Sequence, residues 1–283
     1  MKNVKENIMK SVFLLAATVS IVAVVLICVF LFVSGIPAIG KIGLAEFLTG
    51  TIWRPQNNLY GIFPMIIGSI YVTAGALIIG VPIGIFTAIF MAHFCPPRLY
   101  RIMKPATNLM AGIPSVVYGF FGLVILVPFV RNTFGGRGVS VLTASILLGL
   151  MILPTIISMS EAAIRAVPSS YYEGGLALGA SHERSVFSTA VPAAKSGILA
   201  GVVLGLGRAI GETMAVMMVA GNQTIIPAHI TDGVRTLTTN IVMEMGYAAD
   251  LHREALIATA VVLFVFILII NLSFSLLKRR GKQ

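Results

Sequence analysis

Arg208 and Glu212 carry chemistry that is unusual for the place where the sequence puts them. They lie four residues apart within an otherwise apolar stretch from Gly197 to Ala220, and about 20 apolar residues suffice to cross a bilayer core. A charged side chain at that depth costs about 2.5 to 3.5 kcal/mol on insertion scales. We therefore expect the pair to serve a polar function within the membrane.

The chemistry that this pair favours is contact with an oxyanion. A guanidinium group stays ionised and donates two parallel hydrogen bonds, and a neighbouring carboxylate keeps a bound anion from being held too tightly to leave. The hypothesis is that Arg208 transiently contacts a passing anion while Glu212 holds and partly neutralises the arginine. The simpler alternative is a buried ion pair that only locks two helices together.

A helical wheel places both charges on one narrow stripe of the predicted span. On a continuous helix Arg208 and Glu212 fall about 40° apart, on the side that carries Gly197, Gly201 and Gly205. Small residues four apart let membrane helices approach closely, so this glycine stripe is predicted to face protein. The bulky face opposite is predicted to face lipid and consists of Leu199, Val203, Leu206, Ile210 and Met217.

The composition indicates an integral membrane protein. Of 283 residues, 57% are hydrophobic and only 11% charged, whereas soluble domains run near 25% charged. The formal charge of +10 is dispersed through the loops between apolar runs, which favours basic cytoplasmic loops over nucleic-acid binding. Cys28 and Cys95 offer neither a disulfide framework nor a metal-ligand cluster.

Six apolar runs are long enough to span a bilayer, and none alternates like a transmembrane strand. They are residues 12–34, 62–91, 108–130, 139–160, 197–220 and 255–277. The first is too long for the core of a signal peptide and lacks a clear cleavage site, so we expect it to be retained. The predicted fold is an all-α, polytopic membrane helical bundle of six transmembrane helices. We divide it into residues 1–60, with the N-terminal tail, first span and outer loop, and residues 61–283, with the other five helices.

The distribution of Lys and Arg predicts the orientation of these spans. The loops on the side of the N-terminus hold the larger share of the cations, and the C-terminal Lys278, Arg279, Arg280 and Lys282 add to them. Because basic loops stay inside, both termini are predicted to be cytoplasmic. The segment Gly221 to Glu254 is then outside, and its His and acidic residues fit no metal-ligand template, so it is predicted to be a solvated loop.

The cytoplasmic loop of residues 161–196 is predicted to form two short helices. Ser170 and Glu173 have the spacing of a capping box for a helix over about Tyr171 to Leu178. Gly179 is a natural helix stop because glycine adopts a left-handed conformation at little cost. Ser181 is predicted to cap the second helix, which would end before Pro192. An ordinary amphipathic connector is the simpler alternative.

At this point the chain resembles a family, the permease subunits of binding-protein-dependent ABC importers. Glu173, Gly174, Gly175, Gly179 and the pair Val191-Pro192 are similar to its loop signature. Three departures from the signature are visible: glycines replace two alanines, Val191 replaces leucine, and Thr189 replaces an apolar residue. The resemblance implies the type I ABC importer permease fold and coupling helices that dock into a cleft on an ATPase subunit.

A narrower resemblance lies in two spans. Gly207 to Val216, which includes Arg208, Glu212 and Thr213, resembles the fifth-span motif of the PstC-type permease of phosphate ABC importers, and Ala111 to Gly119 resembles its third-span motif. This resemblance implies phosphate passage at Arg208, Glu212 and Thr213. It also implies a bacterial inner-membrane location, a second homologous permease subunit, two ATP-binding subunits that hold ATP and Mg, and an extracytoplasmic phosphate-binding protein. No cofactor or metal is expected in this chain.

Three other functions remain open from the residues alone. Any tetrahedral oxyanion could use an arginine, so a sulfate or molybdate permease is the first alternative. An ion-coupled secondary carrier with Glu212 as a proton site is the second, although no internal repeat is obvious. An intramembrane enzyme is the weakest, because no His or Asp at membrane depth pairs with Ser115, Tyr118 or Ser158. The sequence also lacks a Walker A motif, so no ATP hydrolysis is expected in this chain.

Overall fold

The computed structural model describes the backbone of residues 2–280 and the side chains of Glu6 and of residues 9–273. Six of the cations used to predict the orientation therefore lie outside the described side chains. They are Lys2, Lys5, Lys278, Arg279, Arg280 and Lys282. Within the described part the regular structure is helical apart from one short hairpin, in which β1 (Trp53–Arg54) pairs antiparallel with β2 (Leu59–Tyr60) across η1 (Pro55–Asn57). The longest irregular segment, residues 221–236, lies between the last two pairs of helices.

The helices of the first half begin with α1 (Lys2–Ile42) and α2 (Leu44–Thr49). After the hairpin come α3 (Phe63–Ile89), which continues as the π-helix η2 (Phe90–Phe94), and α4 (Pro97–Gly112). One further span then consists of α5 (Ser115–Phe121), the π-helix η3 (Gly122–Leu126) and α6 (Val127–Phe134). The half ends with α7 (Val141–Arg165).

The helices of the second half begin with four short segments. They are α8 (Ser169–Ala177), α9 (His182–Ser185), the π-helix η4 (Val186–Ala190) and α10 (Val191–Ala193). Then follow α11 (Lys195–Gly211), α12 (Met214–Val219), α13 (Leu237–Met245) and α14 (Asp250–Arg280).

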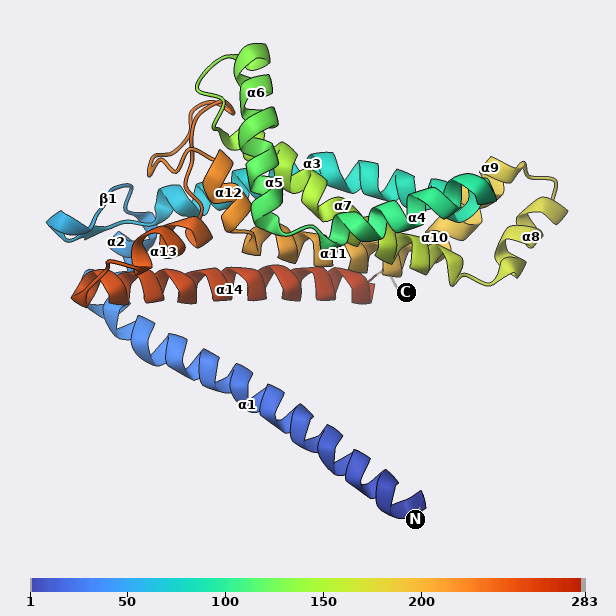
Figure 1. The fold of residues 1–283 in the computed structure, drawn as a ribbon, viewed down its shortest axis with the longest axis horizontal. Coiled ribbons are helices and arrows are strands. Elements are labelled where there is room, and N and C mark those ends of the chain that lie inside the picture. Colours follow the sequence, from blue (N-terminus) through green and yellow to red (C-terminus); the bar gives the residue numbers. More distant parts are fainter. Residues whose placement is uncertain (1, 281–283) are drawn as a thin grey trace.

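The centre of the fold is a bundle in which α7 packs against α3 on one side and α11 on another. Its core is apolar and includes Val72, Leu147, Met151, Ile152 and Val216. Figure 1 shows α3, α7, α11 and α14 running side by side, with α8 and α9 at one end and the hairpin, α2 and α13 at the other. We refer to these as the α8 end and the α13 end.

Two elements leave this bundle. Most of α1 runs away from it (Figure 1), and its most hydrophobic 18-residue window has no buried residue. Only its last turns pack on α14, where Phe32 meets Phe264 edge to face and a Cβ on Gly35 would lie 2.7 Å from Val261 Cγ2. The other element is the α5–α6 span, which rises steeply from the side of the bundle (Figure 1).

Five described helices are long and apolar enough to cross a membrane, or six if the bent pair His182–Ala193 and Lys195–Gly211 is one span. This agrees with the predicted helical bundle, with three changes of boundary. The third span begins at Ser115 rather than residue 108, because the chain breaks after Gly112 and α4 is a separate amphipathic helix. The fifth breaks after Gly211. Residues Glu161–Arg165, assigned to the cytoplasmic loop, still belong to α7.

Candidate functional site: an arginine at two broken helices

Arg208 lies in the last turn of α11, partly buried. Its Nη1 atom is 3.5 Å from Thr155 Oγ1 on α7, which is the outer limit of a hydrogen bond. None of the ion pairs among the described residues includes Arg208. This guanidinium therefore retains most of its donor capacity.

Glu212 does not continue the helix, so its predicted place on the wheel is wrong. It is the C-terminal residue that follows α11, with an extended backbone (ψ 128°). Its Oε1 accepts the backbone N–H groups of Thr213 and Ala215, each at 3.1 Å, and so caps the start of α12. Its backbone carbonyl accepts the Thr238 hydroxyl at 3.2 Å. The carboxylate thus fixes a helix break, and Thr213 forms that break beside it.

The three glycines of the stripe lie against α7. A Cβ on Gly201 would be 2.9 Å from Met159 Cβ, and one on Gly205 would be 3.0 Å from Ile156 Cγ1. Gly197 approaches Ala163 in the same way. The face predicted to meet lipid is partly wrong, because Leu206 and Ile210 are each only 5% exposed.

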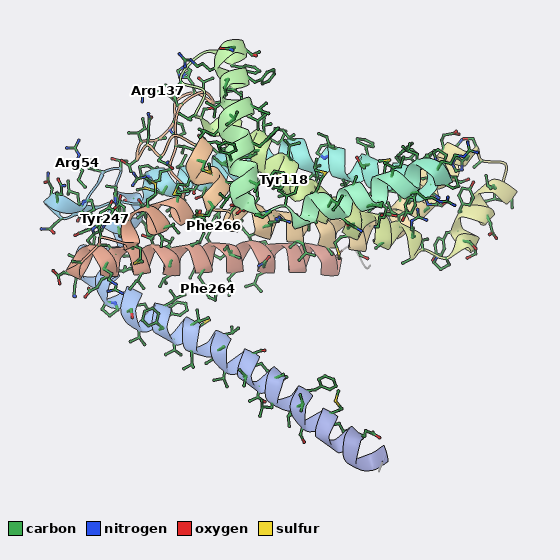
Figure 2. All side chains as sticks on the ribbon, viewed as in Figure 1. Arg54, Tyr118, Arg137, Tyr247, Phe264 and Phe266 are labelled. Carbon is green, nitrogen blue, oxygen red and sulfur yellow. The ribbon has the colours of Figure 1, made fainter. Side chains whose placement is uncertain are left out.

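A second helix break lies close to the first. The chain turns at Ile113 and Pro114, between α4 and α5, and the Tyr118 hydroxyl donates to the Met110 carbonyl across it at 3.0 Å. Figure 2 shows Tyr118 near the base of α5, beside the bundle. A Cβ on Gly119 would lie 3.0 Å from Ala215 Cα, so α5 and α12, the helices after the two breaks, are in direct contact.

Residues 166–194, which we call the coupling segment after the loop signature that they resemble, form the predicted pair of short helices with two corrections. The predicted capping box is absent, since α8 begins after Pro168 with no side-chain cap. The second helix does not end before Pro192, because α9, η4 and α10 follow without a gap as far as Ala193. The left-handed Gly179 (φ +82°) and the cap by Ser181, whose hydroxyl accepts the Arg184 N–H, are as predicted.

The signature residues of this segment have different environments. Glu173 and Gly174 are exposed on α8, and Pro192 is exposed in α10. A Cβ on Gly174 would meet nothing within 4 Å, whereas one on Gly175 would lie 2.7 Å from Ser185 Oγ. Gly175 is therefore required for the contact between α8 and α9, and Gly174 is not. Exposed apolar side chains surround them: Tyr171, Leu176, Leu178 and Phe187.

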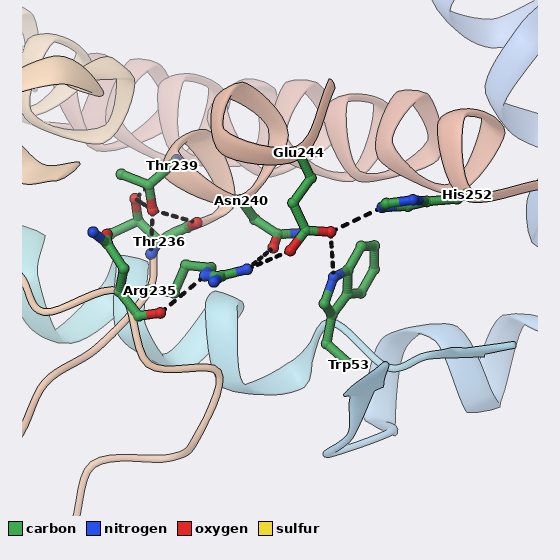
Figure 3. Close-up of polar contacts among 8 residues, drawn as sticks. Trp53, Arg235, Thr236, Thr239, Asn240, Glu244 and His252 are labelled. Atoms are coloured by element: carbon green, nitrogen blue, oxygen red, sulfur yellow. Dashed lines mark hydrogen bonds and ion pairs between the residues drawn. The ribbon is translucent and has the colours of Figure 1, made fainter. Parts of the chain in front are cut away.

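Only part of the segment from Gly221 to Glu254 is the solvated loop predicted from the sequence. Residues 221–232 are irregular and mostly accessible, whereas α13 is a helix with buried polar side chains. Glu244, only 7% exposed, accepts Arg235 Nη1 at 2.6 Å and Trp53 Nε1 at 2.9 Å, and its Oε2 is 2.8 Å from His252 Nε2. Figure 3 shows this Glu244 network between α13, α14 and the hairpin. Among the described residues, no group of three or more His, Cys, Asp or Glu side chains could hold a metal ion.

Comparison of the sequence with known proteins identifies its family. Residues 80–283 match the family model described as the binding-protein-dependent transport system inner membrane component. The chain is 40% identical to a probable ABC transporter permease protein, YqgH, of Bacillus subtilis, over 90% of this chain and 86% of that protein. It is 34% identical to the phosphate transport system permease protein PstC of Mesorhizobium japonicum, over 86% of this chain and 81% of that protein.

A solved structure supports the fold. It is a bacterial ABC transporter involved in the import of the acidic polysaccharide alginate, with a TM-score of 0.66, 14% identity, and coverage of 98% of this chain and 99% of that one. At this identity the likeness concerns the fold alone, which is that of an ABC importer permease. The chain thus belongs to the family of binding-protein-dependent transport system inner membrane components.

Proposed function

We propose that this chain is a permease subunit of an ATP-driven importer and that it carries inorganic phosphate past Arg208. The observation that carries the proposal is the environment of this arginine. It lies at the end of a membrane-type helix and has one weak side-chain contact, to Thr155 at 3.5 Å. A cation with unused donors is costly in a membrane unless a ligand passes it. Relatives that bear the name of a phosphate transport permease support phosphate as that ligand.

The two helix breaks support a pathway at this point. Irregular backbone at membrane depth is tolerated where it is buried in protein or lines a water-filled cavity. Here the breaks at Pro114 and Glu212 belong to α4–α5 and α11–α12, whose later halves touch. Arg208 lies one turn before the second break. We infer that phosphate passes between these breaks, with Arg208 as the cationic contact and Glu212 and Thr213 fixing the geometry beside it.

The α8 end supports docking of an ATPase subunit. Leu178 is 91% exposed and Tyr171 54% exposed, on a segment whose sequence resembles the coupling loop of this family. In this proposal the α8 end and both termini are cytoplasmic, and ATP and Mg are bound by two copies of the ATPase. The exposed apolar length of α1 contacts lipid and the second, homologous permease, and an extracytoplasmic phosphate-binding protein delivers cargo at the α13 end.

The test is uptake by the four-subunit importer in proteoliposomes, supplied with its binding protein. We expect ATP-dependent accumulation of phosphate and not of sulfate or molybdate. If another oxyanion is accumulated in preference to phosphate, that ion is the transported substrate and the proposal of phosphate is wrong. If uptake requires an ion gradient and no ATP, the protein is a secondary carrier and not part of an ATP-driven importer.

The coupling surface has its own test. Gly179→Val places a β-branched residue at φ +82°, where it is strained, and Glu173→Arg changes an exposed charge on α8. We expect each to reduce co-purification of the ATPase, whereas Gly174→Ala, which meets no neighbour, retains it. Normal co-purification with both of the first two variants would rule out α8 as the docking element.

A further inference from the structure

Glu161 is a buried carboxylate that the proposed pathway does not use. It is 1% exposed, and its Oε1 accepts the Tyr100 hydroxyl at 2.7 Å and Arg165 Nε at 2.9 Å, while Oε2 accepts Lys104 Nζ at 2.7 Å. The hydrogen bond to Glu161 also raises the pKa of Tyr100 above its ordinary value. We call these four residues the Glu161 network.

The network joins three segments of the chain at the α8 end. Tyr100 and Lys104 belong to α4, and Glu161 and Arg165 belong to α7. Arg165 Nη2 also donates to the Met91 carbonyl in η2 at 2.7 Å, and its Cζ lies 4.7 Å over the Tyr100 ring. One carboxylate thus holds the end of α4 to α7, and its arginine partner holds both to the end of the α3–η2 helix.

The network also lies between the coupling segment and the proposed pathway. Along α7, Thr155, the contact of Arg208, precedes Glu161 by less than two helical turns, and α8 begins shortly after Arg165. Along α4, the far end carries the Met110 carbonyl that accepts the Tyr118 hydroxyl at the first helix break. Both helices of the network therefore run from the α8 end of the bundle toward the helix breaks beside Arg208 (Figure 1).

The chemistry of the network opposes sliding between α4 and α7. A carboxylate removed from water is stable only while its hydrogen-bond donors stay in place. A small shift of α4 along α7 would lengthen the bonds from Tyr100 and Lys104 and leave part of a buried charge unpaired. Packed interfaces respond to displacement by moving as a unit or by changing to another discrete arrangement.

We propose that the Glu161 network is a strut that makes α4 move together with α7, so that displacement of α8 by the ATPase reaches the helix break beside Arg208. Glu161 is a positioning residue in this scheme, because it touches no cargo. The inference rests on the proposed function, since it needs an ATPase at the α8 end and an anion pathway at Arg208.

The experiment compares Glu161→Gln with the wild type in the reconstituted four-subunit importer. Phosphate uptake and ATP hydrolysis are measured in the same vesicles, with loaded binding protein, and their ratio is the readout. We expect the variant complex to assemble and to hydrolyse ATP, with the number of anions carried per ATP reduced about tenfold or more. An unchanged ratio, with only the yield of complex reduced, would mean a purely structural role and would overturn the proposal.

Three control variants separate this outcome from misfolding, and one further measurement separates it from a wrong cargo. Glu244→Gln alters another buried carboxylate with several donors, and we expect a reduced yield with a normal ratio. Lys104→Arg keeps a cation and should keep the ratio within about twofold of the wild type.

If Glu161→Gln yields no complex, the variant Tyr100→Phe is used in its place. It removes one donor without changing charge and should still lower the ratio of anions carried per ATP. A normal ratio in Tyr100→Phe would overturn the strut. If wild-type vesicles carry another oxyanion, the ratio is measured with that ion, so the two proposals fail separately.

Discussion

Arg208 is partly buried and Arg235 is largely buried, and the two arginines differ in how many hydrogen-bond acceptors surround them. Arg235 has a side chain 13% exposed and donates to Glu244 Oε1 at 2.6 Å, to Asn240 Oδ1 at 3.0 Å and to the Asn222 carbonyl at 3.1 Å. Arg208 has the single 3.5 Å contact to Thr155. A saturated guanidinium can only hold structure together, whereas one with unused donors can receive a ligand.

The comparison also separates two carboxylates near helix ends. Glu244 neutralises its arginine directly. Glu212, expected from the sequence to do the same for Arg208, caps α12 with its Oε1 atom instead. Arg208 therefore has no ion pair among the described residues, and Glu212 fixes a helix break one turn after it. The proposal that phosphate contacts Arg208 depends on this difference.

Arg235→Met gives the largest expected effect on stability. It leaves Glu244 buried without its cation, which typically costs about 3 to 5 kcal/mol, and the midpoint of thermal unfolding of the purified complex should fall clearly. The double variant Arg235→Met with Glu244→Gln should lose less, because no unpaired charge stays buried. The matched variant Arg208→Met should stay within about 1 kcal/mol of wild type. Equal losses at the two arginines would remove the distinction between them.

Trp53→Phe sharpens the same comparison with a smaller expected effect. It removes the Nε1–H that donates to Glu244 Oε2 at 2.9 Å, and a lost buried hydrogen bond costs about 1 to 3 kcal/mol. The loss of stability is measured by thermal unfolding of the complex, followed by far-ultraviolet circular dichroism, whose signal comes from the helices and does not depend on Trp53. Tyr247→Phe, at a side chain 71% exposed, is the control and should be nearly neutral. A Trp53→Phe complex as stable as wild type would show that the Glu244 network contributes little.

Thr155→Val gives the smallest expected effect on stability. The change is nearly isosteric and removes only a contact at the limit of hydrogen bonding, so thermal stability should change by less than about 0.5 kcal/mol. Thr73→Val, at a buried hydroxyl elsewhere in the bundle, is a suitable comparison. A loss of more than about 1 kcal/mol at Thr155 alone would mean that Thr155 anchors Arg208, and the contrast with Arg235 would weaken.

Much of this architecture could be predicted from local signals in the sequence. The apolar runs predicted the spans, a glycine after a helix predicted the left-handed Gly179, and Ser181 predicted a cap. Even the amphipathic α4 had a signal, since Arg98, Arg101 and Lys104 recur at helical spacing in the loop just before the predicted third span. The division of the chain at residue 60 and the sidedness of the termini stay predictions.

The remainder depends on contacts between distant parts of the chain. The break at Glu212 is stabilised by Thr238, whose hydroxyl reaches its carbonyl, and nothing in the apolar pattern of residues 197–220 marks it. The Glu244 network joins Trp53, Arg235 and His252 from three separate segments. The Glu161 network likewise needs α4 beside α7. The spacing of residues in the sequence predicts neighbours within one helix and does not predict contacts between separate helices.

The most direct test of the account is the pair Arg208→Lys and Arg208→Met in reconstituted importer, scored for phosphate uptake together with thermal stability and binding of the loaded phosphate-binding protein. Because lysine keeps the charge and loses the planar fork, we predict that both variants reduce uptake at least about tenfold while stability and binding-protein affinity stay normal. Near-normal uptake by Arg208→Met in a stable complex would contradict the account, since phosphate would then pass without the arginine.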